Sequence, residues 1–161
     1  MNRTTADRTD GTRHRTPVQT MSRVAAVVLL IIGVLGFIPG ITANYGQLAL
    51  MGDRSEAMLL GVLPVSILHN VLLLVFAAVL WWAARSVAAA KTTLLVLAVV
   101  NWLMALYGLL NERGTSPYWE PAGVGDNWFH LVLGLVLFAF GLVRGTKTVG
   151  RPRRAIHPGT A

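Results

Sequence analysis

Four long runs without a charged residue constrain this chain more than any other feature. They occupy residues 24–41, 57–84, 92–110 and 128–143. A helix needs about 20 apolar residues to cross a bilayer, so each run is close to or above that length. Only 13% of the 161 residues are charged, against about a quarter in soluble domains. The sequence therefore predicts an all-α membrane protein, an antiparallel bundle of four transmembrane helices, and excludes a soluble enzyme, a disordered chain and a disulfide scaffold.

The span boundaries follow from prolines and charges. We expect one membrane domain over residues 24–144, with spans at about 24–41, 64–84, 92–110 and 127–143. Pro64 suits the first turn of the second helix, because a helix tolerates proline there. The polar, basic segments 1–23 and 145–161 are expected to be disordered tails. A cleaved signal peptide is the competing interpretation of the first span, although residues 41–43 make a poor cleavage site.

The basic residues predict the orientation. Of the 14 Lys and Arg, five precede the first span, two lie between the second and third, and five follow the fourth. The remaining two, Arg54 and Arg113, lie in the other two loops. The positive-inside rule then places both termini in the cytoplasm, with the protein in the cytoplasmic membrane. The net charge of +7 is thus explained by topology, and no nucleic-acid motif accompanies it. The expected partners are the lipid bilayer and a second copy or another membrane protein.

Chemistry-bearing motifs are scarce. The chain has no cysteine, which excludes thiol catalysis and thiolate metal sites. It also has no P-loop, dinucleotide-binding, zinc-protease or hydrolase nucleophile motif. The sequence therefore does not indicate an enzyme, and it predicts no catalytic residue.

Polar side chains inside the apolar spans are the candidate functional residues, because they are costly in a membrane. In the second span they share one helix face through i, i+3 and i+4 spacing, and in the fourth Asp126 and Asn127 precede His130 by four and three residues, which also places them on one face. The candidate polar cluster is Ser66, His69, Asn70, Asn101, Asp126, Asn127 and His130. Counted from the arginines that end these spans, His69 and His130 lie at similar depth, near the outer leaflet.

The cluster has one structural interpretation and three functional ones. The structural one is a set of interhelical hydrogen bonds that hold the bundle together. The alternatives are axial ligation of haem b by His69 and His130, a divalent metal bound by both histidines with Asp126, and a proton relay to a quinone or a transported solute. The sequence favours hydrogen bonding, so no cofactor or metal is predicted; haem b or quinone contact through His69 and His130 is the main alternative.

Glycines mark expected helix contacts. Small residues let membrane helices approach closely, and the candidates for helix packing are Gly33, Gly36, Gly40, Gly134 and Gly141. The second and fourth spans each carry a histidine near one end and an arginine at the other. This similarity is consistent with two parallel helical-hairpin repeats.

Three short elements carry a family resemblance. They are Gly36–Gly40 (GFIPG), Leu68-His69-Asn70 (LHN) and Asp126–His130 (DNxxH followed by an apolar run with glycines). With them, residues 22–144 resemble an uncharacterised family of actinobacterial four-span integral membrane proteins. The resemblance implies the same architecture and brings no known activity. We therefore expect an accessory or structural membrane protein, with a redox-associated subunit as the alternative.

Overall fold

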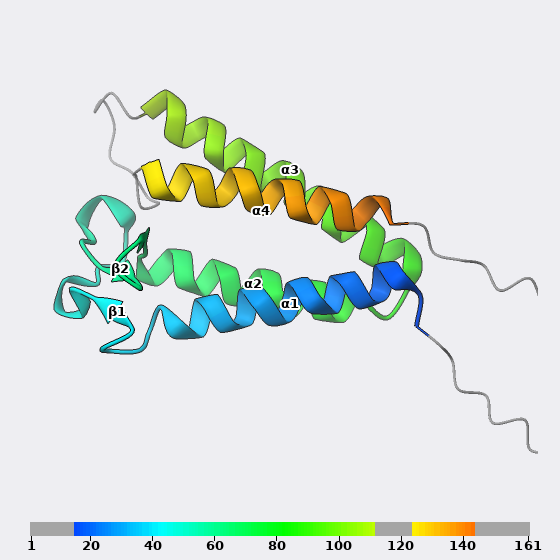
Figure 1. Ribbon diagram of the computed structural model, residues 1–161, viewed down its shortest axis with the longest axis horizontal. Coiled ribbons are helices and arrows are strands. Elements are labelled where there is room, and N and C mark those ends of the chain that lie inside the picture. The colour runs from blue at the N-terminus through cyan, green and yellow to red at the C-terminus, as the bar shows by residue number, and fades with distance from the viewer. Residues whose placement is uncertain (1–14, 112–123, 144–161) are drawn as a thin grey trace, which may run out of the picture.

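The computed structural model describes residues 15–111 and 124–143, and this part of the chain is mostly helical. Its helices are α1 (Pro17–Leu35), α2 (Ile67–Ala83), α3 (Val87–Asn111) and α4 (Val124–Leu142). Between α1 and α2, a small antiparallel sheet in the order β1-β2-β3 is formed by Thr42–Ala43, Met58–Leu59 and Leu63–Pro64. The α2–α3 turn and the start of α1 lie at one end of the molecule, and the sheet lies at the other (Figure 1).

The helices are arranged as two hairpins. Helix α1 packs mainly on α2, and α3 packs mainly on α4, while contacts between the two pairs are fewer. We call α1–α2 the first hairpin and α3–α4 the second. The core that joins them is rich in small residues, with larger leucines at a few fully buried positions such as Leu29, Leu80, Leu94 and Leu137.

Helix α1 differs most from its expected span. It begins at Pro17 and ends at Leu35, so the prediction of 24–41 was wrong at both ends. The tail prediction for 1–23 was also wrong from Pro17 onward, while residues 1–14 lie outside the described part. The early start has a local cause: Thr16 is the N-cap, Pro17 occupies the first helical position, and the Gln19 side chain accepts a hydrogen bond from the Thr16 N–H at 3.0 Å.

The end of α1 is set by the segment that follows it. Pro39 lacks the N–H that a continuing helix needs, and the Thr42 hydroxyl donates to the Leu35 carbonyl at 3.1 Å. Gly40 has a φ of +88°, and apart from its chain neighbours no atom of the described residues lies within 4 Å of where a Cβ would stand. It is therefore a turn glycine, and its assignment to helix packing was wrong.

The other helices differ less from expectation. Pro64 belongs to β3, and α2 begins three residues later because Ser66 caps it, accepting a hydrogen bond from the His69 N–H at 3.1 Å. Helix α3 begins at Val87 rather than at residue 92. At this start, the Ser86 hydroxyl accepts a hydrogen bond from the Ala89 N–H at 3.1 Å. The expected tail over 145–161 lies outside the described residues.

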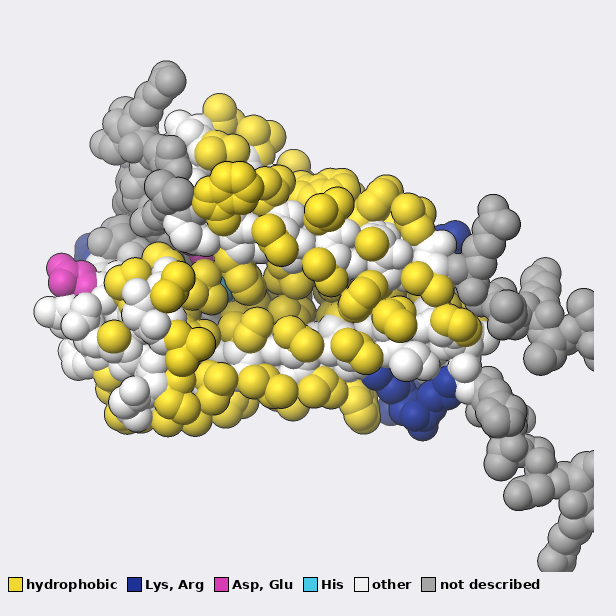
Figure 2. Space-filling view, viewed as in Figure 1, with side chains coloured by type: hydrophobic (Ala, Val, Ile, Leu, Met, Phe, Trp, Pro, Cys, Tyr) yellow, Lys and Arg dark blue, Asp and Glu magenta, His cyan; other side chains and the backbone are white. Residues whose placement is uncertain are grey.

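The outer surface of the helices is apolar. Large side chains such as Ile31, Leu103 and Leu135 are at least half exposed, and hydrophobic atoms cover the visible face of both hairpins (Figure 2). Within the described residues, three helices are long and apolar enough to cross a membrane, namely α1, α3 through Leu110 and α4 from Gly125; α2 is apolar with 17 residues. These helices indicate a membrane protein.

Candidate functional site

Four of the seven predicted polar residues meet at the end of the bundle that carries the sheet. His69 lies in the first turn of α2, Asn101 in α3, and Asp126 and His130 in the first turns of α4. Each is between 2% and 5% exposed. We call these four residues the polar centre. It draws on three helices and both hairpins.

Asn101 fixes the orientation of His130. The Asn101 Nδ2 donates to the Leu97 carbonyl in its own helix at 2.8 Å, which directs Oδ1 toward α4. That oxygen lies 2.9 Å from His130 Nδ1. Because a carbonyl oxygen only accepts, His130 Nδ1 carries the proton of this hydrogen bond. In a neutral ring, the lone pair then lies on Nε2, 3.6 Å from Asp126 Oδ2.

His69 connects the first hairpin to this pair. Its Nδ1 lies 4.0 Å from Asp126 Oδ1. Its ring centroid is 5.8 Å from that of His130, with the rings edge-on, and 5.9 Å from that of Phe129. The Asp126 carboxylate therefore lies beside both imidazoles, one from each hairpin. One ligand-type atom from each of His69, Asp126 and His130 lies within 4.8 Å of the other two.

A small cavity adjoins the polar centre. Its volume is about 150 Å³, and His69, Asn101 and His130 form its polar wall. The other lining side chains are apolar and come from α2 and α3. This space can hold a few small molecules such as water beside the imidazoles.

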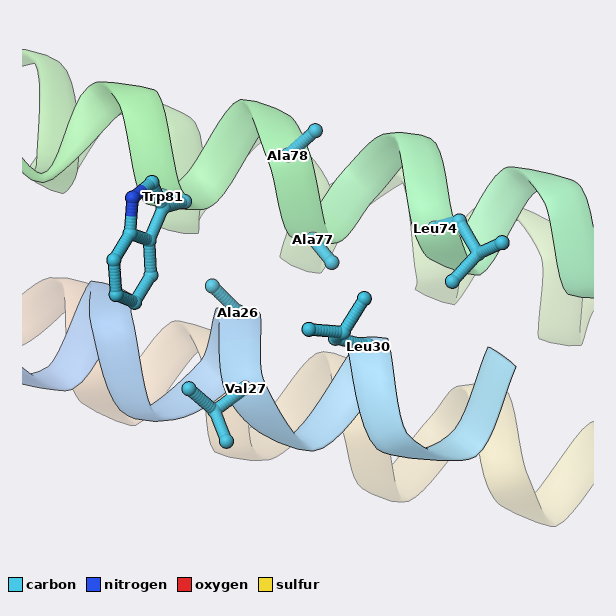
Figure 3. Close-up of a pocket in the computed structure, with 7 residues that line it drawn as sticks. All are labelled: Ala26, Val27, Leu30, Leu74, Ala77, Ala78 and Trp81. Atoms are coloured by element: carbon cyan, nitrogen blue, oxygen red, sulfur yellow. The ribbon is translucent and has the colours of Figure 1, made fainter. Parts of the chain in front are cut away.

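A larger groove of about 390 Å³ follows the contact between α1 and α2 from the middle of α2 toward its C-terminal end. Figure 3 shows its lining side chains, which run from Leu74 and Leu30 to Trp81. All of them are apolar apart from the Trp81 indole N–H, so this groove offers a hydrocarbon-like surface and no group for chemistry.

The three remaining predicted residues have other structural roles. Ser66 is the N-cap of α2. Asn70 packs over Gly36 at the α1–α2 contact, and Asn127 packs over Gly108 at the α3–α4 contact. The amide atoms of Asn70 are fully buried and find no hydrogen-bond partner among the described residues. The seven residues thus form one centre, one helix cap and two helix contacts.

Glycines allow the helices to approach at several of these points. A Cβ at Gly33 would meet Leu74 and the Asn70 carbonyl, and one at Gly36 would collide with the Asn70 side chain. In the second hairpin, Gly134 faces the Trp102 ring and Gly141 faces Leu95. These four glycines lie where the prediction put close packing.

Sequence reasoning missed two polar contacts of the first hairpin. The Ser22 hydroxyl donates to the Leu80 carbonyl at 2.8 Å, and Gln19 Nε2 donates to the Ala84 carbonyl at 3.1 Å. Both residues had been assigned to the tail. The Thr16-Pro17-Val18-Gln19 segment, typical of a helix start, was the signal that could have found them.

The family comparison agrees with these boundaries. The sequence model of a family described as a domain of unknown function, DUF4383, matches residues 19–143. This chain belongs to the DUF4383 family. The match runs from the first turn of α1 to the end of α4 and includes every residue of the polar centre. The resemblance to an uncharacterised family is thereby confirmed. No curated protein and no solved structure matched the chain.

Proposed function

We propose that this DUF4383 protein is an integral protein of the cytoplasmic membrane that crosses it four times and has an accessory or structural role. The observation that carries the proposal is the inverted polarity of the helices. Small and polar residues such as Ser22, Asn70 and Asn101 are buried between helices, while valines and leucines face outward. A soluble bundle has the opposite pattern, whereas membrane helices associate through small and polar residues.

Four crossings are supported by how α2 lies against α1. Helix α2 is about 25 Å long at 1.5 Å per residue, a little short of the hydrocarbon core of about 30 Å. It runs beside α1 from the sheet to the α2–α3 turn (Figure 1). If α1 crosses the membrane, α2 returns through it, and Leu63–Ser66 supply the remaining length.

The charge distribution supports cytoplasmic termini. The α2–α3 end carries the exposed Arg85 and Lys91, and dark-blue side chains gather there in Figure 2. The guanidinium of Arg23 lies 5.2 Å from the Trp81 ring centroid, and Trp81 and Trp82 are both more than half exposed. Tryptophan with basic residues is typical of a membrane interface. Under the positive-inside rule this end is cytoplasmic, and the polar centre lies near the outer leaflet.

Within this bundle we assign the polar centre the role of joining the two hairpins. The hairpins share fewer contacts than the helices within each of them, and the His69–Asp126 approach links α2 to α4. A hydrogen bond between membrane helices contributes about 0.6 kcal/mol on average and about 1.7 at most. The His69 Nδ1 to Asp126 Oδ1 distance of 4.0 Å is longer than a hydrogen bond, so we expect this contact to contribute no more than that amount.

The redox alternative receives less support from this geometry. The Asp126 carboxylate lies beside both imidazoles, where a porphyrin held between His69 and His130 would have to fit. The adjoining cavity of about 150 Å³ is smaller than the roughly 300–1,000 Å³ of pockets for drug-sized ligands. Binding of haem b or a quinone ring at this point would require the hairpins to separate.

Cysteine accessibility in intact cells tests the topology. The chain contains no cysteine, so single substitutions report without background. Gln47→Cys and Ala88→Cys form a matched pair, because both positions are exposed and lie at opposite ends of the bundle. We expect a membrane-impermeant maleimide to label position 47 in intact cells and position 88 only after permeabilisation. Labelling of position 88 in intact cells would contradict the proposed orientation.

A further inference from the structure

We propose that His69, Asp126 and His130 bind one divalent transition-metal ion, with Zn²⁺ as the ion that best fits the donors. The inference deepens the proposed structural role and rests on it, because the three ligands come together only when the two hairpins are docked. The ion would then be a cross-link between α2 and α4 near the outer leaflet.

The spacing of the donor atoms is close to that of a metal site. Ligand atoms bound at about 2.0–2.1 Å to a tetrahedral ion lie about 3.3–3.4 Å from one another. Asp126 Oδ2 lies 3.6 Å from His130 Nε2, and Asp126 Oδ1 lies 4.0 Å from His69 Nδ1. With the three ligand atoms all within 4.8 Å, small side-chain rotations bring them to bonding distance.

Asn101 prepares His130 for this role. A metal-binding histidine commonly donates its other ring N–H to an oxygen acceptor, which fixes the ring and its tautomer. Asn101 Oδ1 is that acceptor at 2.9 Å, and the Leu97 carbonyl holds the amide in the orientation required. His130 Nε2 is left to present its lone pair toward Asp126.

The charges favour a cation at this point. In the neutral ring, the Nε2 lone pair of His130 faces a carboxylate oxygen across 3.6 Å. A metal cation placed between these two atoms would be attracted by both. All three residues are at most 5% exposed, so the charge of the cation interacts with them in a medium of low dielectric constant, where the attraction is stronger than in water.

The donor set and the cavity define the class of ion. Two imidazole nitrogens and one carboxylate suit Zn²⁺ and its transition-metal neighbours, whereas Ca²⁺ and Mg²⁺ require six or more oxygen ligands. Three protein ligands leave a fourth position open. The cavity of about 150 Å³ borders both histidines and gives that position room for a water molecule.

Metal titration of the full chain tests the proposal. The protein is purified in detergent with a tag that contains no histidine, stripped with a chelator, and titrated with Co²⁺, whose visible absorption reports tetrahedral nitrogen and oxygen ligands. We expect saturation at one Co²⁺ per chain and displacement by Zn²⁺. A folded wild-type protein that shows no saturable Co²⁺ spectrum and no Zn²⁺ binding by calorimetry would overturn the metal site.

Matched variants distinguish metal binding at this site from metal binding elsewhere on the chain. His14→Ala with His157→Ala removes the only two other histidines of the chain and should leave the titration unchanged. Asp126→Asn should weaken binding at least 100-fold, and Asn101→Ala about 10–100-fold. Binding that persists in Asp126→Asn, or that disappears in the His14/His157 variant, would overturn the assignment.

Failure of the metal site can be distinguished from failure of the proposed membrane topology. Helix content by circular dichroism and elution volume show whether each variant is folded. The accessibility of Gln47→Cys and Ala88→Cys does not depend on metal. Expected labelling together with absent metal binding would therefore refute only the metal site.

Discussion

The hydrogen bond between Asn101 and His130 gives a quantitative prediction for the second hairpin. The Asn101→Leu substitution keeps a side chain of similar size and removes the oxygen that lies 2.9 Å from His130 Nδ1. The His130→Phe substitution keeps a ring and removes the donor. The two single variants and the double variant form a thermodynamic cycle that isolates the contact between the two side chains.

The magnitude follows from the burial of both partners, which are 2% and 5% exposed. A buried donor left without its acceptor costs about 1–3 kcal/mol. Measured hydrogen bonds between membrane helices are weaker, about 0.6 kcal/mol on average and about 1.7 at most. We expect Asn101→Leu to lower the free energy of unfolding by about 1–2 kcal/mol, and the cycle to give a coupling of about 0.6–1.7 kcal/mol.

The assay is unfolding in mixed micelles by a denaturing detergent, followed by circular dichroism, with a chelator present so that no ion contributes. Ser22→Ala provides the control, because its hydroxyl bonds the Leu80 carbonyl within the first hairpin. Combined with Asn101→Leu, it should be additive within about 0.3–0.5 kcal/mol. A coupling between Asn101 and His130 no larger than that of the control pair would refute the contact.

Two further predictions concern helix packing and insertion. Gly36→Ala should destabilise the protein by about 1–3 kcal/mol, because the Asn70 side chain fills the space of the new methyl group. Gly46→Ala should change the free energy of unfolding by no more than about 0.5 kcal/mol in the same assay, because apart from its chain neighbours no described atom lies within 4 Å of the new methyl group. The double variant His69→Leu with His130→Leu should still insert, because apolar residues favour insertion. Loss of membrane localisation in a fusion-reporter assay would show that the histidines are needed for insertion itself.

The number, order and approximate position of the helices could be predicted from the four uncharged runs, because hydropathy and charge are local properties of the sequence. The limits of α1 could not be read in the same way. Hydropathy extended the helix through Gly36–Gly40, where Pro39 and the positive φ of Gly40 end it. It also excluded Pro17–Arg23, where the polar side chains of Gln19 and Ser22 find partners on the neighbouring helix.

The candidate site was predicted in part for a related reason. The i, i+3 and i+4 spacing placed Ser66, His69 and Asn70 on one face. The structure directs His69 toward α4 and Asn70 toward Gly36 of α1, and it uses Ser66 as a cap. Residues that share one helical face can still point toward different neighbouring helices. Which neighbour each residue meets depends on the rotation of α2 about its axis, and that rotation is set by packing against two helices rather than by the local sequence. The spacing therefore identified the residues but not which of them would meet.

The docking of the two hairpins at the end of the bundle that carries the sheet is the central claim, and a disulfide tests it most directly. A Cβ at Gly125 in α4 would lie 3.5 Å from the Cδ atom of Pro64 in β3, so the two residues are in direct contact, the proximity that a disulfide requires. On mild oxidation in membranes, Pro64→Cys with Gly125→Cys should cross-link and resist later modification by a polyethylene glycol maleimide. The control pair, Ala88→Cys with Gly125→Cys, lies at opposite ends of the bundle (Figure 1) and should stay reduced. Cross-linking of the control pair, or free thiols in the test pair, would contradict the arrangement.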